Sequence, residues 1–169
     1  MTEIQNADLG FSKEAVYYFD LPSDEKRDGR LDVLKQRLKS NSKINSVSIS
    51  SDVPSSNNNW SSNFWFDDKR EDVPFMTSLK YGDADYFENF GLQFAAGKGF
   101  SESDTLKEAV INETMARKLN VANVEDAVGK RITICGGEPW MTITGVVKDF
   151  AQNSLREEVK PFIIATEKQ

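Results

Sequence analysis

A lysine flanked by glycines is the first feature of the sequence that could bind a phosphate. Gly91, Gly97, Lys98 and Gly99 lie close together in the chain. A P-loop uses two glycines, a lysine and a following Ser or Thr to hold phosphates and magnesium. Here five residues separate Gly91 from Gly97, and Gly99 stands where the metal-binding hydroxyl should be. This spacing argues against nucleotide binding, and we expect no nucleotide cofactor.

Pairs of carboxylates are the second feature that could carry chemistry. Glycosidases place two of them on either side of a sugar, and Asp83 with Asp85, or Glu113 with Asp149, would supply such a pair. Nothing in the surrounding sequence predicts that the pKa values of a pair differ, as an acid and a base require. Asp83 and Asp85 also lack the remaining oxygen ligands and the closing Glu of a calcium loop. Solvated surface carboxylates are the simpler interpretation, and a carboxylate hydrolase ranks last among three functional hypotheses.

The sequence contains no histidine and a single cysteine, Cys135. The lack of histidine removes the commonest zinc ligand, the commonest general base and any Ser-His or Cys-His nucleophile pair. Cys135 falls in an apolar alternation, which predicts a buried, unreactive thiol. We therefore predict that the chain is not an enzyme and that it holds no metal ion or cofactor.

An aromatic cluster is the candidate contact site for a partner or an apolar ligand. It consists of Trp60, Phe64, Trp65 and Phe66 and follows an Asn-rich loop. In a strand, Phe64 and Phe66 would point to one face and Trp65 to the other. Exposure of one set would mark a contact site, whereas packing of both sets would mark a core. The sequence leaves both interpretations open.

Length and composition indicate an ordinary globular protein. The 169 residues are 38% hydrophobic and 28% charged, which suffices for one domain or two small subdomains. The net charge is −6 without a basic stripe, which argues against nucleic acid as a partner. No stretch approaches the roughly 18 apolar residues of a transmembrane helix, and the polar N-terminus is not typical of a signal peptide. Taken alone the chain would be cytosolic, unless it is a loop of a larger membrane protein.

Hydrophobic periodicity predicts the elements that position these residues. Strands are expected where apolar residues alternate or cluster, and helices where they recur every three to four residues. The predicted strands are 16–21, 46–53, 60–66, 73–81, 109–111, 131–135, 140–147 and 162–165. One predicted helix opens at Pro22 and Ser23 and ends near Lys39, with Leu31, Leu34 and Leu38 on its apolar face. Two others span 84–90, before Gly91, and 112–119, capped by Asn112. We expect hairpin turns at 67–72 and 136–139.

Short segments follow one another in a specific order between residues 85 and 161. They are 85–92, 96–100, 109–119, 127–132, 143–150, 154–155 and 160–161. Their order and composition closely resemble the periplasmic core domain of MacB-like and FtsX-like ABC transporter permeases. Residues 4–11 also resemble the segment that leaves the first transmembrane helix in that family. The resemblance spans nearly the whole chain and is weakest from 54 to 72.

The positions that match the family have structural rather than catalytic explanations. Glycines suit tight turns or a close approach of two backbones, and Asn112 suits a helix cap. The family-motif residues are Tyr86, Phe87, Gly91, Gly97, Asn112, Glu113, Gly129, Gly145, Asp149 and Phe150.

The resemblance implies an α+β fold with mixed and antiparallel sheets. Residues 1–13 would follow a transmembrane helix, 14–84 and 141–169 would form a porter-like subdomain, and 85–140 a smaller inserted α+β subdomain. Family loops often continue beyond the strand that follows Lys160 and Pro161 with another strand, helix and strand. The porter-like half is therefore expected to be truncated or simpler here.

The function implied by the resemblance is that of a periplasmic loop of an inner-membrane permease. A separate ABC ATPase subunit or domain would hydrolyse ATP, while the loop binds partner proteins or cargo and passes on the conformational change. The expected partners are a periplasmic adaptor, an outer-membrane channel or a lipoprotein, and the full-length protein is expected to be a dimer in the membrane. The alternative is a stand-alone periplasmic module that binds a small molecule or glycan, with Trp60 and Trp65 stacking on the ligand.

Overall fold

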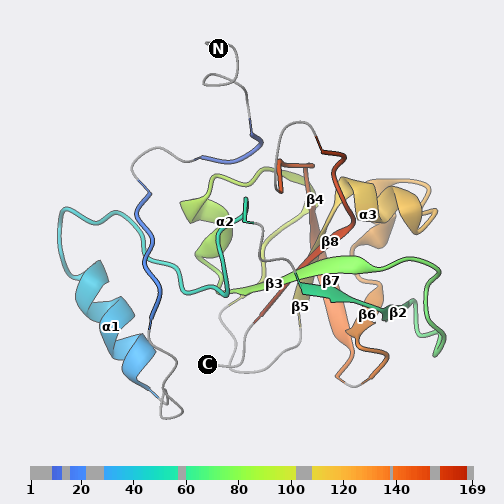
Figure 1. The fold of residues 1–169 in the computed structure, drawn as a ribbon, viewed down its shortest axis with the longest axis horizontal. Coiled ribbons are helices and arrows are strands. Elements are labelled where there is room, and N and C mark those ends of the chain that lie inside the picture. The colour runs from blue at the N-terminus through green and yellow to red at the C-terminus, as the bar shows by residue number, and fades with distance from the viewer. Residues whose placement is uncertain are drawn as a thin grey trace.

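One mixed sheet forms the centre of the protein, with helices at its periphery (Figure 1). The computed structural model describes residues 9–12, 16–21, 29–56, 60–101, 108–137, 139–152 and 157–166. The strands are β1 (Trp60–Ser62), β2 (Phe64–Phe66), β3 (Thr77–Gly82), β4 (Phe94–Gly97), β5 (Glu108–Asn112), β6 (Arg131–Ile134), β7 (Met141–Val147) and β8 (Phe162–Thr166). The helices are α1 (Arg30–Lys39), α2 (Tyr86–Asn89), α3 (Glu113–Lys118) and the short 3₁₀ helix η1 (Val124–Ala127). The predicted α+β fold with a mixed sheet is confirmed.

The strand order brings the two edges of the sheet together. The order is β1-β3-β8-β5-β7-β6-β2, and β4 also pairs with β7. β3 with β8 and β5 with β7 are parallel pairs, and the other pairs are antiparallel. β1 and β2 stand at opposite ends of this order, yet only Asn63 separates them in the chain. The sheet therefore curls back on itself in a barrel-like way, which leaves little free edge.

Two clusters of buried side chains lie on opposite faces of the central strands. In β5, Ala109 and Ile111 belong to one cluster and Val110 to the other; in β8, Ile163 and Ile164 divide in the same way. Alternate residues of a strand point to opposite faces, so these strands are buried on both sides and consist of continuous apolar runs. α3 and η1 contribute to the first cluster, and the aromatic residues of α2 contribute to the second.

The elements expected in the second half of the chain are confirmed. α3 begins at its predicted cap, because the side-chain oxygen of Asn112 accepts a hydrogen bond from the backbone N–H of Met115 at 3.1 Å. β6 and β7 form the predicted antiparallel hairpin, with Ile132 opposite Met141. The predicted strand 162–165 is β8, and α2 ends before Gly91 as expected.

The first third of the chain departs from the prediction. Residues 16–21 are described and form no strand, and the exposed fractions of Tyr17, Tyr18 and Phe19 are 92%, 71% and 64%. The buried strand predicted there is wrong, because aromatic composition alone does not supply a neighbouring strand to pair with. The strand predicted at 46–53 is reduced to a single bridge between Ser50 and Gly82. The predicted helix start at 22–28 lies outside the described residues.

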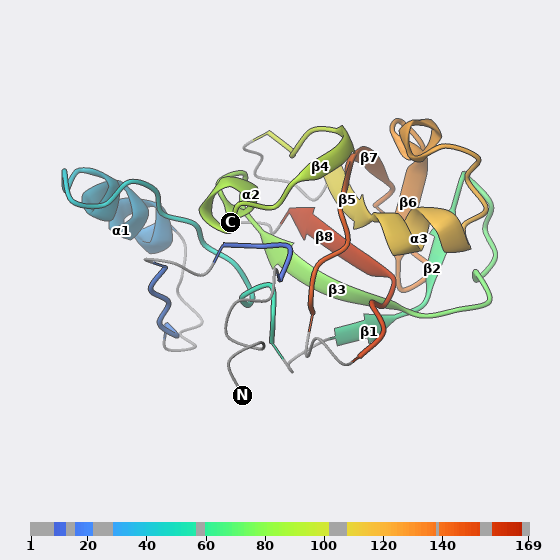
Figure 2. The ribbon, with the colours of Figure 1, turned by 90° about the horizontal axis from the view of Figure 1, so that it is seen from above.

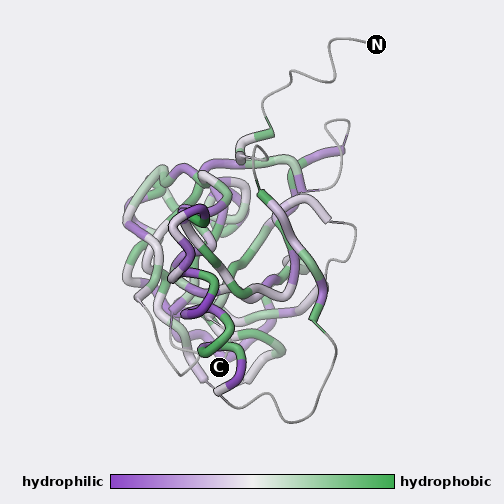
Figure 3. Tube along the Cα trace, turned by 90° about the vertical axis from the view of Figure 1, so that its left-hand side faces the viewer, coloured by the Kyte–Doolittle hydropathy of each residue, from purple (hydrophilic) through white to green (hydrophobic). Residues whose placement is uncertain are grey.

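Helix α1 lies to one side of the sheet (Figures 1 and 2). Leu31, Leu34 and Leu38 are half-buried, so the predicted apolar stripe is present but incompletely covered. Figure 3 looks onto this side of the molecule and shows hydrophobic and hydrophilic residues interleaved along it. No helix in the described ranges is long and apolar enough to cross a membrane.

The two predicted subdomains contribute strands to the same sheet. β4, β5 and β6 come from residues 85–140, whereas β1, β2, β3, β7 and β8 come from 14–84 and 141–169. β5 lies between β7 and β8. The division of the chain into a porter-like and an inserted subdomain stays a prediction.

Candidate functional site

Strand β2 positions the aromatic cluster, and its alternation is as predicted. Phe64 is fully buried and packs against Phe75 with ring centroids 5.3 Å apart. Phe66 packs against the same core cluster, and the Nζ atom of Lys130 lies 5.6 Å from the centroid of its ring. Trp65, between Phe64 and Phe66, therefore points to the outer face of the sheet.

The indole ring of Trp65 is fixed from three sides. Its centroid lies 6.3 Å from that of Trp140, at an interplanar angle of 44°. Its Nε1–H donates to Oδ1 of Asp72 at 3.1 Å, and the Nδ2 atom of Asn63 donates to the same carboxylate at 3.0 Å. A Cβ atom added at Gly136 would lie 3.2 Å from the indole, so this turn passes directly beneath the ring.

The positively charged side chain of Arg131 lies next to the two indoles. Its guanidinium carbon lies 5.1 Å from the centroid of Trp140, which is cation–π geometry. Its NH1 atom also lies 3.0 Å from Oδ1 of Asp68. Asp67 and Asp68 have φ of 57° and 61° and form a turn after β2. The hairpin predicted around 67–72 is only partly present, because β1 pairs with β3 whereas β2 pairs with β6.

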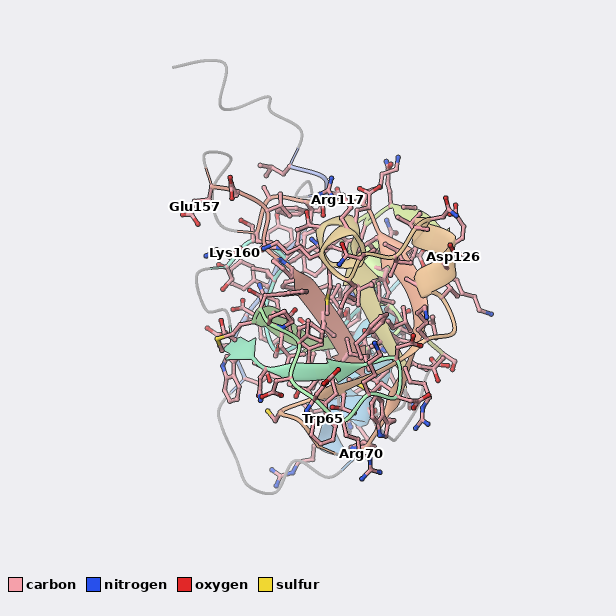
Figure 4. All side chains as sticks on the ribbon, turned by 90° about the vertical axis from the view of Figure 1, so that its right-hand side faces the viewer. Trp65, Arg70, Arg117, Asp126, Glu157 and Lys160 are labelled. Carbon is pink, nitrogen blue, oxygen red and sulfur yellow. The ribbon has the colours of Figure 1, made fainter. Side chains whose placement is uncertain are left out.

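A buried threonine, Thr133 of β6, stands opposite Trp65 in the neighbouring strand. The β6–β7 register places Trp140 beside it on the other strand. Thr133 is fully buried, and its Oγ1 is the single buried side-chain polar atom without a hydrogen-bond partner among the described residues. Such a group costs about 1–3 kcal/mol. We call Trp65, Thr133, Trp140 and Arg131 the aromatic surface. Figure 4 shows Trp65 at the opposite end of the view from Arg117.

Trp60, the remaining member of the predicted cluster, lies outside the aromatic surface. It is 70% exposed on β1, opposite Leu79 of β3, at the other end of the strand order. The sequence predicted one cluster, but the corner at Asn63 sends its two tryptophans to different strand pairs.

Cys135 is exposed, and the prediction of a buried thiol is wrong. The β6 ladder ends at Ile134, and Cys135 then takes a φ of 58° in the turn toward β7. The turn removes this residue from the apolar alternation on which the prediction rested. Its Sγ atom lies 3.3 Å from the hydroxyl of Ser62.

Asp83 and Asp85 lie close together, and both form ion pairs with lysines of α1. Asp83 is buried and accepts hydrogen bonds from Lys35 Nζ at 2.8 Å, Ser48 Oγ at 2.7 Å and the backbone N–H of Ile49 at 2.7 Å. Asp85 lies 2.7 Å from the Nζ atoms of both Lys35 and Lys39. Burial alone would raise the pKa of Asp85, but hydrogen bonds from the two lysines lower it below its ordinary value. This pair serves as an attachment point for α1.

Glu113 and Asp149 also lie together, around the start of α3. Asp149 accepts hydrogen bonds from Asn112, from the backbone and hydroxyl of Thr114, and from Arg117, at 2.8–2.9 Å. Glu113 Oε2 accepts from the backbone N–H of Asp149 at 3.1 Å. An open depression of about 490 Å³ beside them is lined by Thr114, Arg117, Lys118, Asp149, Glu158 and Val159. Within the described ranges, no group of three or more acidic or cysteine side chains could hold a metal ion.

A comparison with models of protein families identifies the family of the chain. A model of the MacB-like periplasmic core domain matches residues 10–164. The chain belongs to this family. The resemblance given by the segments between 85 and 161 is thereby confirmed.

One solved structure shares the fold of this MacB-like domain, and two others are similar to part of it. The periplasmic region of MacB from Actinobacillus actinomycetemcomitans has a TM-score of 0.54 and 21% identity, over 79% of this chain and 53% of that one. A domain of a putative permease protein from Porphyromonas gingivalis has a TM-score of 0.49 and 18% identity, over 71% of this chain and 49% of that one. The extracellular domain of the noncanonic ABC-type transporter YknZ from Gram-positive bacteria has a TM-score of 0.46 and 18% identity, over 64% and 50%. The chain thus spans about half the length of these structures. A comparison with curated proteins finds no match.

The family-motif residues of this MacB-like domain lie at structural positions. Tyr86, Phe87 and Phe150 belong to the second core cluster. Gly91 and Gly129 have φ of 58° and 89°, next to α2 and β6. Gly97 and Gly145 stand opposite each other where β4 meets β7.

Sequence reasoning missed three of the four residues of the aromatic surface. Trp140, Thr133 and Arg131 fall within or beside the predicted hairpin strands 131–135 and 140–147. The signal that could have found them is the pairing register of this hairpin with the strand that carries Trp65, because cross-strand neighbours share a face.

Proposed function

We propose that this domain is the extracytoplasmic part of an ABC transporter permease. In this proposal it binds a partner protein or cargo and passes on conformational change driven by ATP hydrolysis in a separate domain or subunit. The observation that carries the proposal is the family match over residues 10–164. The likeness in fold to the periplasmic region of MacB supports it.

Cys135 supplies a test of location, because it is the only cysteine of the chain and is exposed. In cells that express the full-length protein and have a permeabilised outer envelope, a membrane-impermeant maleimide is expected to label Cys135 while the inner membrane is intact. The Cys135→Ser variant gives the background from cysteines elsewhere in the protein. Labelling that requires lysis of the inner membrane would reject the extracytoplasmic location.

We place the partner contact at the aromatic surface. Tryptophan and arginine are the residues that most often dominate binding energy at protein interfaces. The indoles of Trp65 and Trp140 and the guanidinium of Arg131 lie together there. The proposed partners are a periplasmic adaptor, an outer-membrane channel or a lipoprotein, and the ABC ATPase acts through the full-length permease, which we propose is a dimer.

Replacing Trp140 by alanine is expected to weaken partner binding roughly tenfold, because interface hot spots contribute on the order of 1–2 kcal/mol or more. The measurement is a calorimetric titration of this domain with the adaptor or lipoprotein encoded beside the permease gene. Trp60→Ala is the control, since Trp60 is an exposed tryptophan on β1, away from the aromatic surface. If the Trp140→Ala variant and the unchanged domain bind the partner with equal affinity, the partner does not contact the aromatic surface.

The alternative function is a module that binds a small molecule or glycan. The paired indoles of Trp65 and Trp140 could stack on a sugar ring, and the guanidinium of Arg131 beside them could hydrogen-bond to it. The same titration with soluble oligosaccharides decides between the two functions. Oligosaccharide binding that Trp65→Ala abolishes, together with partner binding that it leaves unchanged, would favour the module.

A further inference from the structure

Helix α1 is attached to the rest of the protein by charged side chains. Lys35 and Lys39 are one turn apart, and both reach toward the start of α2. The Nζ atom of Lys35 lies 2.8 Å from Asp83 and 2.7 Å from Asp85, and that of Lys39 lies 2.7 Å from Asp85. The side chains of Lys35 and Asp83 are only 9% and 5% exposed, so this ion pair is shielded from water.

The apolar side chains of α1 lie outside the two core clusters, neither of which contains a residue of α1 among its described members. Leu31, Leu34 and Leu38 are half-buried, and Val33 is 49% exposed. Figures 1 and 2 show the helix to one side of the sheet. The most buried polar contacts of α1 are those of Lys35 with Asp83 and Asp85.

Ser48 and Ile49, which follow α1, also bind Asp83, whereas residues 51–54 are held to β3 by different bonds. Ser51 exchanges hydrogen bonds with Tyr81: its backbone N–H donates to the Tyr81 carbonyl at 2.8 Å, and its Oγ accepts from the Tyr81 N–H at 2.9 Å. Lys80 Nζ donates to the backbone carbonyls of Val53 and Pro54. Val53 also packs against the second core cluster. These contacts do not depend on α1.

We propose that α1 docks and undocks as one unit, with Asp83 and Asp85 as its latch, while residues 50–54 stay fixed to β3. The functional role of this movement rests on the proposed function. In that role, a movement that reaches α1 would be passed through Asp83 and Asp85 to α2. Asp85 is the residue before α2, whose Tyr86 and Phe87 lie in the second core cluster. Docking itself is a property of this chain alone.

Hydrogen–deuterium exchange on the 169-residue chain tests the latch. Lys35→Met removes both short contacts of Lys35, and Asp85→Asn weakens both lysine contacts without loss of a cap, because Asp85 makes no side-chain cap hydrogen bond. In each variant the amides of residues 34–39 are expected to exchange at least about tenfold faster, since charged pairs that lose a partner leave the other charge uncompensated. The amides of Ser51 and Tyr81 are expected to keep their protection.

Asp67→Asn is the matched control, because it breaks the exposed Lys130–Asp67 pair of the same 2.8 Å length. Unchanged protection of α1 in both latch variants would overturn the proposal. So would a simultaneous loss of protection at Ser51 and Tyr81, because α1 would then not be a separate unit. Failure of the Cys135 labelling would reject the location in the cell and leave the exchange result standing.

Discussion

Replacing Gly145 by alanine is expected to lower the free energy of unfolding by about 3 kcal/mol. β4 and β7 meet glycine to glycine, with Gly97 opposite Gly145. A Cβ atom at Gly145 would lie 2.4 Å from the carbonyl oxygen of Lys98 and 2.9 Å from the ring of Phe94. Overpacking of this kind costs about 1–3 kcal/mol. The strands would also have to separate, which strains the bond from Lys98 N–H to the Thr144 carbonyl at 3.1 Å and adds about 1 kcal/mol.

Urea denaturation of the purified domain measures this loss. Gly137→Ala is the matched control, because the nearest atom to its added Cβ is 3.9 Å away and its φ is not positive. The control is expected to change the unfolding free energy by less than about 0.5 kcal/mol. If Gly145→Ala is as stable as Gly137→Ala, the close approach of β4 and β7 is not a constraint on this family-motif glycine.

The second half of the fold follows from local sequence because each element there is buried by its own neighbours. β5 and β8 are continuous apolar runs since both of their faces are covered, and Asn112 caps α3 three residues before the amide that it binds. Residues 16–21 are also rich in apolar and aromatic side chains, but they form no strand. A strand depends on a distant partner, which no local pattern contains.

The candidate site also depends on pairing between distant segments, which local sequence does not predict. Alternation in β2 correctly oriented Phe64 and Trp65, because the two faces of a strand are a local property. Trp140 lies 75 positions after Trp65, and their contact depends on pairing between β2 and the β6–β7 hairpin. The Lys35–Asp83 pair joins residues 48 positions apart, so sequence reasoning left Asp83 as a surface carboxylate.

Lys80 is expected to make the protein more stable as the pH rises from 7 to 9.5. Lys80 lies on β3 and is 1% exposed, and its Nζ atom donates hydrogen bonds to the backbone carbonyls of Val53 and Pro54. Burial lowers the pKa of Lys80 to about 8 from 10.5, and the nearby carboxylate of Asp52 only partly offsets this. The folded protein therefore binds this proton more weakly than the unfolded chain does.

The sign follows from proton binding. Between pH 8 and 10.5 the unfolded chain keeps the proton on Lys80 while the folded protein releases it, so the free energy of unfolding increases with pH. The increase from pH 7 to 9.5 amounts to about 2 kcal/mol. Burial also raises the pKa of Tyr86, which would reverse the trend above about pH 10, where an unfolded tyrosine ionises. The window below pH 9.5 avoids that reversal.

Urea denaturation at pH 7, 8, 9 and 9.5 measures the profile of the unchanged domain and of Lys80→Met. The variant is expected to lose the upward slope, whatever its stability at pH 7, because methionine has no proton to release. Lys130→Met is the control, since the side chain of Lys130 is 31% exposed and pairs with Asp67 at the surface; it is expected to keep the slope. A slope in Lys80→Met as steep as that of the unchanged domain would show that Lys80 keeps its charge inside the fold, so that its hydrogen bonds to the segment after α1 outweigh the cost of burying an ammonium group.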